Sequence, residues 1–390
     1  MTRGHDPEGQ KTLHGGMGFT TEIQREDKGM KRRQFIKAAG LGVAASAMAA
    51  PAIAQSMPEL KWRMTTSWPK SLDTLFGGAE LMCKAVAEAT DNKFQIQCFA
   101  GGEIVPGLQV VDAVQNGTVE CGHTASYYYF GKDPTFAFGT SVAFGPNQRL
   151  NQGWFTLGGG KEVLNEFYKK YNATALLAGN TGCQMGGWYR KEIKTVDHLK
   201  GLKMRIGGFP GRVLQKLGAV PQQIAAGDIY PALEKGTIDA AEWVGPYDDE
   251  KLGFYKVAPN YYYPGWWEGG SMLFTFVNLD KWNALPKNYQ AILEQAGHYA
   301  NTWMVAKYDE LNPQALRKLL GYGAKLNGFS PAIMEACFNA AKELHGEIAK
   351  ENASFKKVYD SMTNYSNNGY QWFQVAELNY DTFMARHSRS

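Results

Sequence analysis

Two stretches of the chain alternate short strand patterns with helical patterns, and this alternation limits the fold more than any other feature. From Leu60 to Thr124, strand patterns at 60–65, 93–99 and 119–124 enclose helical patterns at 72–90 and 107–116. The same alternation returns from Ala173 to Val244. It predicts two α/β lobes with mainly parallel strands. Because no linker divides them, we expect several crossovers and a cleft that closes around a ligand by hinge motion.

The expected boundaries follow from these patterns. We expect a first α/β lobe at 57–150, with return segments after about residue 245, and a second α/β lobe at 151–245. Beyond Pro286 the pattern changes to long amphipathic helices, which predicts a C-terminal helical region at 286–390. Its expected helices are Lys287–Asn312, Pro331–Lys350 and a final aromatic stretch, Tyr370–Met384.

Composition and charge exclude several classes of protein. A chain of 390 residues, 44% of them hydrophobic, can bury the cores of two lobes. Residues 1–54 carry 8 Lys/Arg and 5 Asp/Glu, which leaves 33 basic and 32 acidic residues in the rest, so no basic stripe suggests nucleic acid. The five cysteines form no CxxC pair or zinc spacing and are interpreted mainly as buried apolar residues, with one disulfide left open.

The N-terminal region has the order of an export signal. The basic segment Lys31–Lys37 contains paired arginines followed by Phe35, then a short apolar run and a small-residue cleavage pattern before Gln55. This predicts a twin-arginine signal peptide at 30–54 and a periplasmic location; the alternative is a basic amphipathic helix. Because residues 1–29 are polar and patternless, we interpret them as a mis-called extension, with translation starting at Met30.

Three motifs in the second lobe resemble one transport family. They are a Gly-Leu-Lys-Met-Arg strand at 201–205, a Gly-Ala…Pro turn at 218–221, and Tyr-x-Ala-Leu-x-x-Gly-x-x-Asp at 230–239. In this order they resemble the DctP-type solute-binding proteins of TRAP (tripartite ATP-independent periplasmic) transporters, over nearly all of 57–390. The resemblance implies a two-lobed periplasmic-binding-protein fold with an interlobe cleft and long C-terminal helices, and TRAP membrane permease subunits as partners.

Two departures from the commoner dicarboxylate branch matter. Glu242-Trp243 stands where that branch usually has Glu-Asn, and a second acidic cluster occurs at 265–270 around Glu268. Both resemble the 2-oxo-acid branch, which implies pyruvate or a longer 2-oxo monocarboxylate as ligand. Members of that branch can form homodimers by exchanging a C-terminal helix. Lactate or another 2-hydroxy acid is the alternative ligand.

Arg205 is the candidate for gripping the ligand's carboxylate. It ends a predicted strand and is followed by two glycines, which let a ligand approach the backbone closely. A guanidinium there can hold a carboxylate with two parallel hydrogen bonds. The alternative is a surface salt bridge to an acidic residue.

Glu242 and Glu268 lie in apolar, aromatic surroundings, where an unpaired carboxylate is costly. Oxygen ligands suit hard cations, and the resemblance implies a cation bound by Gln184, Glu242, the Trp243 carbonyl and Glu268. There the ligand's carboxylate and keto oxygens would chelate the same ion. The alternative is two ion-paired glutamates. Charge balance favours calcium at a dry site, the resemblance favours sodium, and sodium is our prediction.

Asn180 and the run Tyr127-Tyr128-Tyr129 complete the expected site. The tyrosines follow the predicted strand 119–124, and ligands dock at the carboxyl ends of parallel strands. We expect Tyr129 and Tyr128, rather than Tyr127, to reach the ligand. Asn180 could donate to an oxygen of the acid, and Gln184 is expected to contact both ligand and cation.

The rival class is a hydrolase or lyase with a metal–carboxylate centre. Its motifs are absent from the sequence, which has no HExxH, no GxSxG and no phosphate-binding GxGxxG or GxxxxGK[ST]. A pair of glutamates could still perform acid–base chemistry, but we predict a binding protein and not an enzyme. A ligand sensor that feeds a receptor is a third class, which the sequence does not separate from transport.

Overall fold

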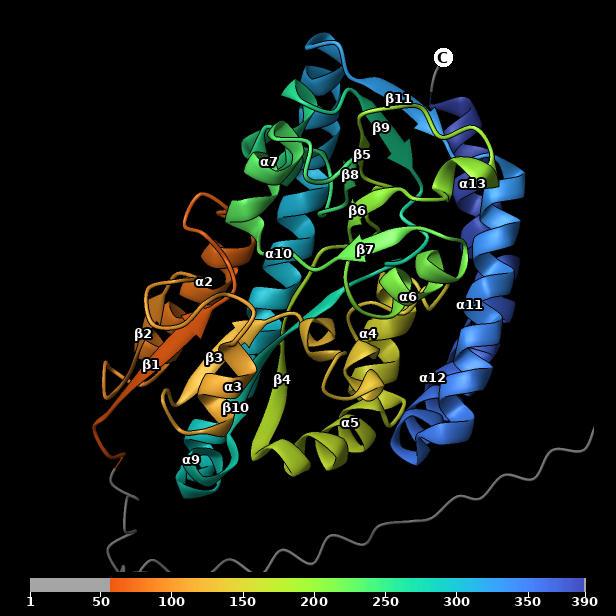
Figure 1. Cartoon of the computed structure of the whole chain (residues 1–390). Helices are drawn as coiled ribbons and strands as arrows, with labels where there is room; N and C mark the ends of the chain where they lie inside the picture. The colour runs from red at the N-terminus through yellow and green to blue at the C-terminus, as the bar shows by residue number, and fades with distance from the viewer. Residues whose placement is uncertain (1–56, 389–390) are drawn as a thin grey trace, which may run out of the picture. The chain divides into compact units, whose positions relative to one another are not determined.

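The computed structural model describes residues 57–388, which form one compact unit with two mixed sheets. The expected extension and signal peptide lie outside the described residues. Figure 1 shows the first strands of one sheet in red to orange and most strands of the other sheet in green. No helix within 57–388 is long and apolar enough to cross a membrane, and all five cysteines are free thiols.

The first sheet has five strands in the order β2-β1-β3-β10-β4. The strands are β1 (Leu60–Thr66), β2 (Phe94–Phe99), β3 (Cys121–Thr124), β4 (Ala173–Asn180) and β10 (Met272–Asn278). β1 pairs in parallel with β2 and β3, whereas β10 is antiparallel to both β3 and β4. Trp62 and Met64 of β1 are buried while Lys61 and Arg63 are exposed, as strand alternation predicts.

The second sheet has six short strands in the order β11-β9-β5-β8-β6-β7. They are β5 (Trp188–Tyr189), β6 (Lys203–Arg205), β7 (Val220–Gln222), β8 (Ala240–Ala241), β9 (Asn260–Tyr263) and β11 (Lys325–Gly328). β6 runs parallel to both β7 and β8. The side chains that follow β6 and β8 therefore leave the sheet at the same edge.

Helices cover the sheets and connect them. They are α2 (Leu75–Ala89), α3 (Val110–Gln115), α4 (Gln148–Leu157), α5 (Gly160–Tyr168), α6 (Gly208–Lys216), α7 (Ala226–Glu234), α8 (Pro246–Leu252), α9 (Leu279–Ala284) and α10 (Lys287–Gly321). α10 packs against α2 and β4 in the first lobe and against α8 beside the second. It buries Tyr289 and Leu293 in one cluster with Trp62 and Phe94.

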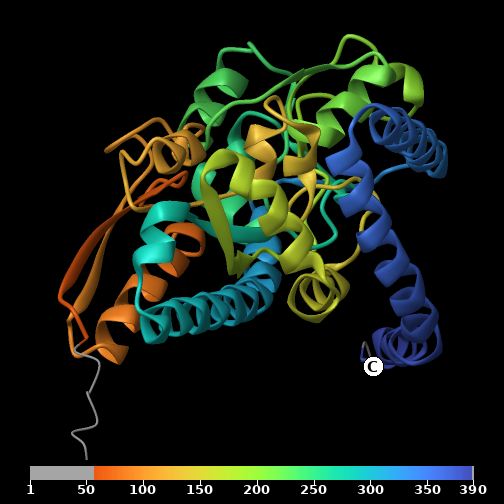
Figure 2. The same cartoon turned by 90° about the horizontal axis from the view of Figure 1, so that it is seen from below.

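The C-terminal region is helical, as predicted, apart from β11. It continues from α10 into α11 (Pro331–Glu351), α12 (Ala353–Val375) and α13 (Glu377–His387). Ser330 accepts a hydrogen bond from the Ile333 backbone N–H at the start of α11, and Asn352 caps α12 in the same way. Figure 2 shows α11, α12 and α13 in blue along the side opposite to the orange strands of the first sheet.

Two parts of the predicted division into lobes are wrong. β9 lies after residue 245, where the chain was expected to return to the first lobe, but it pairs with β5 and β11 in the second sheet. β4 was expected in the second lobe, within 151–245, but it pairs with β10 in the first sheet. The chain therefore passes to the second sheet through 181–187 and returns through 264–271, between β9 and β10. These two segments are the crossing loops, and α10 makes a third passage between the lobes.

Candidate functional site

The candidate residues come from strand ends and from the crossing loops. Arg205 is the last residue of β6, and Glu242 directly follows β8, the parallel neighbour of β6. Gln184 lies in the first crossing loop and Glu268 in the second. Tyr127 lies in a single turn of 3-10 helix after β3, so both lobes contribute to the site.

Backbone hydrogen bonds hold the two crossing loops together. The Gln184 N–H donates to the Glu268 carbonyl at 3.1 Å, and the Gly265 N–H donates to the Gln184 carbonyl at 2.9 Å. A Cβ at Gly265 would lie 2.7 Å from the carbonyl oxygens of both Gln184 and Met185. Glycine is therefore required at 265 for the close approach of the loops.

Arg205 is 1% exposed and is surrounded by acceptors and rings. Its Nε donates to the Ile224 carbonyl at 3.1 Å, and its Nη1 donates to the Glu242 carbonyl at 2.7 Å and to Glu242 Oε1. The Tyr127 hydroxyl lies 3.5 Å from Nη2, and Cζ lies 4.9 Å from the centre of a Trp243 ring. The surface salt bridge considered as an alternative is therefore excluded, because this ion pair is buried.

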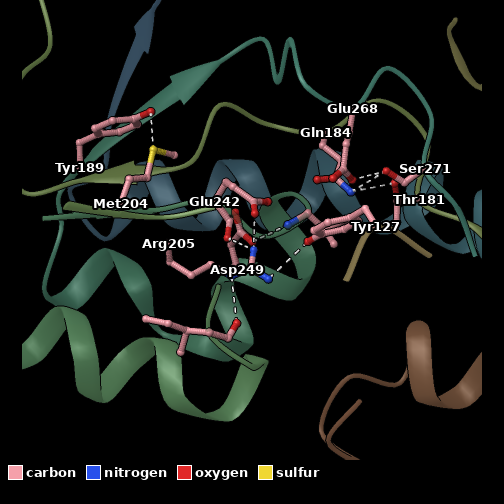
Figure 3. Close-up of polar contacts among 12 residues, drawn as sticks. Tyr127, Thr181, Gln184, Tyr189, Met204, Arg205, Glu242, Asp249, Glu268 and Ser271 are labelled. Atoms are coloured by element: carbon pink, nitrogen blue, oxygen red, sulfur yellow. Dashed lines mark hydrogen bonds and ion pairs between the residues drawn. The ribbon is translucent and has the colours of Figure 1, made fainter. Parts of the chain in front are cut away.

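Gln184 and Glu268 meet in a second group of contacts, which Figure 3 shows beside the Arg205 group. The Gln184 Nε2 donates to the Thr181 hydroxyl at 3.1 Å and to Ser271 Oγ at 3.3 Å. Ser271 in turn donates to Glu268 Oε2. These bonds fix the Gln184 amide so that its oxygen, which is buried, has no partner.

A small cavity lies between these groups. Its lining combines aromatic rings from both lobes with hydroxyl, amide and carboxyl groups: Trp68, Leu75, Ala125, Tyr127, Tyr128, Thr140, Thr181, Gln184, Trp243, Val244, Glu268, Ser271 and Leu273. Arg205 and Glu242 lie behind this lining, where Arg205 contacts Tyr127 and Trp243. Apolar walls with a few polar groups are typical of a small-molecule site.

Burial controls the protonation of the charged groups here. Loss of solvent raises the pKa of Glu242, while the Arg205 charge acts in the opposite direction. Burial and then the nearby Glu242 charge raise the pKa of Glu268. Burial is the largest single influence on the pKa of Arg205 and lowers it, but the Glu242 charge together with Tyr127 and Tyr128 outweighs burial, and the net shift is upward. Arg205 therefore remains charged, and the two glutamates repel each other.

The donor set fits a hard cation. Gln184 Oε1 and Glu242 Oε2 are buried oxygens without a hydrogen-bond partner, and Glu268 lines the cavity between the loops. Unsatisfied buried acceptors are costly unless a proton or a cation meets them. Within 57–388 no group of three or more His, Cys, Asp or Glu gathers. A cation at this site would therefore depend on amide and carbonyl oxygens as well as on the two carboxylates.

Of the remaining predicted residues, some line the cavity and others do not. Tyr128 lines the cavity as expected, and so does Tyr127. Tyr129 does not: its hydroxyl accepts the Val111 backbone N–H at 2.9 Å, so the preference for Tyr129 over Tyr127 is wrong for the cavity lining. Asn180 is buried at the end of β4, with Oδ1 bonded to the Gly182 N–H and Nδ2 without a partner. It lies next to Thr181 in the chain but outside the lining.

Sequence reasoning missed four polar or aromatic contributors, which are Trp68, Thr140, Thr181 and Ser271. Trp68 lies two residues after the carboxyl end of β1, where the rule applied to the tyrosines would have found it. Thr181 and Ser271 lie in the crossing loops. No local pattern marks these two, because their position depends on where the chain changes sheets.

Comparison with known proteins gives consistent matches. A monocarboxylate 2-oxoacid-binding periplasmic protein of Nostoc sp. is 50% identical over 360 residues, which cover 91% of this chain and 99% of the relative. A TRAP transporter solute-binding protein of Bordetella bronchiseptica, solved as a dimer with calcium and picolinate, is 52% identical with a TM-score of 0.83, covering 85% of this chain and 100% of that one. A TRAP solute-binding protein of Pseudoalteromonas atlantica, with bound sodium and pyruvate, is 38% identical with a TM-score of 0.80, covering 83% and 98%.

The predicted family and the two-lobed α/β fold are therefore confirmed. The model of the DctP family, described as bacterial extracellular solute-binding protein, family 7, matches residues 64–352. That range includes both crossing loops and every candidate site residue. The chain belongs to the DctP family of bacterial extracellular solute-binding proteins, which serve TRAP transporters.

Proposed function

We propose that the protein captures a 2-oxo monocarboxylate, pyruvate or a longer 2-oxo acid, together with a cation, and delivers it to the membrane permease subunits of a TRAP transporter. The observation that carries this proposal is the pairing of a buried guanidinium with two buried glutamates beside an aromatic cavity. Calcium with a monoanion would bring the net charge of −1 at such a site to zero, whereas a neutral ligand alone would leave it at −1.

The relatives support the same ligand class. The Nostoc protein is named for 2-oxo monocarboxylates, and the Pseudoalteromonas protein holds pyruvate. The cavity lining carries one acidic side chain and no basic one, so apart from Arg205 behind it the cavity has no cationic side chain to pair with a second carboxylate on the ligand. Leu75, Val244 and Leu273 would accommodate a short apolar tail.

Each residue has a distinct role in this proposal. Arg205 meets the ligand's carboxylate, while Gln184, Glu242, the Trp243 carbonyl and Glu268 hold the cation. Tyr127 and Tyr128 shape the carboxylate end, and the unpartnered Asn180 amide is the candidate donor to the keto or carboxylate oxygen. The cation, when bound, neutralises carboxylate charge and polarises the ligand's oxygens.

Sodium is the cation that we propose, with calcium as the alternative. The Pseudoalteromonas structure contains sodium and the Bordetella structure calcium, so similar proteins accept either ion. Two glutamates, Arg205 and a monoanion sum to −2, which favours calcium on charge alone. Backbone and amide dipoles at the crossing loops can stabilise the negative charge that remains when sodium is bound.

Calorimetry on mature protein, stripped of ligand by unfolding and refolding, tests this function. We expect 2-oxo acids to bind with sodium or calcium, 2-hydroxy acids such as lactate to bind more weakly, and dicarboxylates not to bind. Arg205→Lys should weaken pyruvate binding by roughly 2 kcal/mol or more, because a lysine cannot reproduce the planar donor fork. If no 2-oxo acid binds in either salt, the proposal is wrong; if lactate binds more tightly than pyruvate, the 2-hydroxy alternative is right.

We also propose export through the twin-arginine signal at 30–54 to the periplasm. The support is the basic–apolar–small order of that segment together with a family of extracellular proteins. Replacing Arg32 and Arg33 with lysine should leave the protein in the cytoplasmic fraction. Unchanged recovery from the periplasm would contradict this route.

A homodimer is the final part of the proposal. α13 and the end of α12 expose a row of large apolar side chains: Trp372, Val375, Leu378, Tyr380, Phe383 and Met384. Within the described chain α13 packs mainly on α12, and the Bordetella relative is a dimer. Light scattering should give a dimeric mass that truncation after Val375 reduces to a monomer. A monomeric mass for the intact mature chain would contradict it.

A further inference from the structure

Arg205 has few donors left for a ligand in this structure. A guanidinium carries five N–H groups, and three of them meet oxygen atoms of Ile224 and Glu242. Both hydrogens of Nη1 are directed to Glu242, one to its carbonyl and one to its carboxylate. Only Nη2 remains, with the Tyr127 hydroxyl 3.5 Å away. A two-point grip on a carboxylate needs two neighbouring nitrogens, so Glu242 competes with the ligand for Arg205.

The two carboxylate oxygens of Glu242 differ in their partners. Its Oε1 accepts from Arg205, whereas Oε2 is buried and has no partner. The residue is 2% exposed, so water does not screen its charge. A cation that bound Oε2 would share the single negative charge of the carboxylate with Arg205. The electrostatic attraction between Glu242 and the guanidinium would then be weaker.

The net charge of Arg205 and the two glutamates also predicts that a cation assists binding of the anion. Without a cation, Arg205 and the two glutamates sum to −1 when all are ionised, so a monoanion would enter a negative site whose only buried cation is already paired. Sodium brings that sum to zero and calcium to +1. The two glutamates are not equivalent, because Glu268 bonds Ser271 and only Glu242 bonds Arg205.

We infer that Glu242 controls the access of the ligand to Arg205, a role that we call the gate. In the ion-free protein the Glu242 carboxylate pairs with the guanidinium, and cation binding releases the guanidinium for the ligand's carboxylate. The inference rests on the proposed function and adds to it the coupling between the two ligands. The cation raises anion affinity through Arg205 as well as through its own charge, and the anion raises cation affinity by the same factor.

Glu242→Gln and Glu268→Gln separate this gate from a simple loss of a cation ligand. Each removes one carboxylate charge, but only Glu242→Gln removes the charged partner of Arg205. In a buffer free of sodium and calcium, Glu242→Gln should bind pyruvate at least tenfold more tightly than the wild type, and clearly more tightly than Glu268→Gln does. Saturating cation should then raise affinity at least tenfold more in the wild type and in Glu268→Gln than in Glu242→Gln, where only the cation's own charge acts.

Equal ion-free affinities of the two variants would overturn the gate and leave the proposed function intact. Failure of the wild type to bind any 2-oxo acid with either cation would instead overturn the function. Thermal unfolding checks that each variant folds. The ion-free affinity measurement is repeated with Glu242→Ala, which removes the side-chain acceptor entirely. If Glu242→Ala also shows no gain over Glu268→Gln, the gate is rejected.

Discussion

At the residue scale, neighbouring side chains of one type have separate tasks. Tyr127 and Tyr129 are two positions apart and both buried, yet one hydroxyl faces Arg205 and the other accepts the Val111 N–H. The run Tyr127-Tyr128-Tyr129 gives no pattern from which these directions could be predicted, because a single 3-10 turn places three successive residues on three faces.

Tyr127→Phe and Tyr129→Phe should therefore separate binding from stability. Tyr127→Phe removes a hydroxyl beside Arg205, the proposed partner of the ligand's carboxylate, and should weaken pyruvate binding by about 1 kcal/mol, with little change in the free energy of unfolding. Tyr129→Phe leaves a buried N–H unsatisfied and should cost about 1–3 kcal/mol of stability with affinity unchanged. Calorimetry and urea unfolding measure the two effects, and the reverse result would refute this assignment.

Arg205 and its neighbours show what the sequence can predict and what it cannot. The type of residue, its place at a strand end and the two glycines after it predict a guanidinium that meets a carboxylate. That Glu242 also contributes a carboxylate to this guanidinium is not predictable, since the contact depends on β6 and β8 being adjacent. Strand order follows from non-local pairing, which local patterns do not encode.

At the element scale, the crossing loops determine the site. β4 illustrates why the sequence does not locate them: all eight of its residues are buried, so its pattern fits a central strand in either lobe. Its partner β10 begins about a hundred residues later, and only that pairing assigns it to the first sheet. The alternation of strands and helices predicts the α/β architecture, but not where the chain changes sheets.

Gly265→Ala tests the contact between the crossing loops. The new Cβ would meet two carbonyl oxygens at 2.7 Å, so the loops must separate. We expect a loss of about 1–3 kcal/mol in the free energy of unfolding and a weaker cation affinity. Gly227→Ala in α7 is the control, because a Cβ there meets nothing within 4 Å; it should be neutral or stabilising by about 0.5–1 kcal/mol. Wild-type behaviour of Gly265→Ala would exclude this role.

α8 joins the lobes through two adjacent buried carboxylates. Asp248 accepts hydrogen bonds from Thr74 and Tyr308, both at 2.7 Å, and Asp249 accepts from Trp188 and Tyr261 at 2.9 and 2.7 Å. Burial raises the pKa of Asp248 to about 6 and that of Asp249 to about 7. α8 thus links elements of the first lobe and α10 to β5 and β9.

These raised pKa values predict a pH-dependent stability. Because the folded protein holds protons that the unfolded chain has lost, the stabilising contribution is present at low pH and declines as the pH rises through 7. Asp249→Asn should reduce the fall in unfolding free energy between pH 6.5 and 8 by about 1 kcal/mol. Asp309→Asn, an exposed change on α10, should leave it unchanged. Identical pH profiles for Asp249→Asn and the wild type would rule out this contribution.

At the scale of the whole molecule, the fold brings both lobes and the crossing loops to one cavity. The first lobe supplies Tyr127 and Trp68 to its lining, the loops supply Gln184 and Glu268, and the second lobe places Arg205 and Glu242 behind it. A ligand that touches all three parts stabilises the closed arrangement by mass action. We therefore expect capture of the ligand and closure of the lobes to be one event.

The most direct measurement is a crystal structure of the mature protein with pyruvate and sodium. We expect the carboxylate of pyruvate on Arg205, with the Glu242 carboxylate moved from the guanidinium onto the ion beside Gln184 and Glu268. Pyruvate bound elsewhere, or an anion in the cavity with no ion beside the two glutamates, would contradict this arrangement.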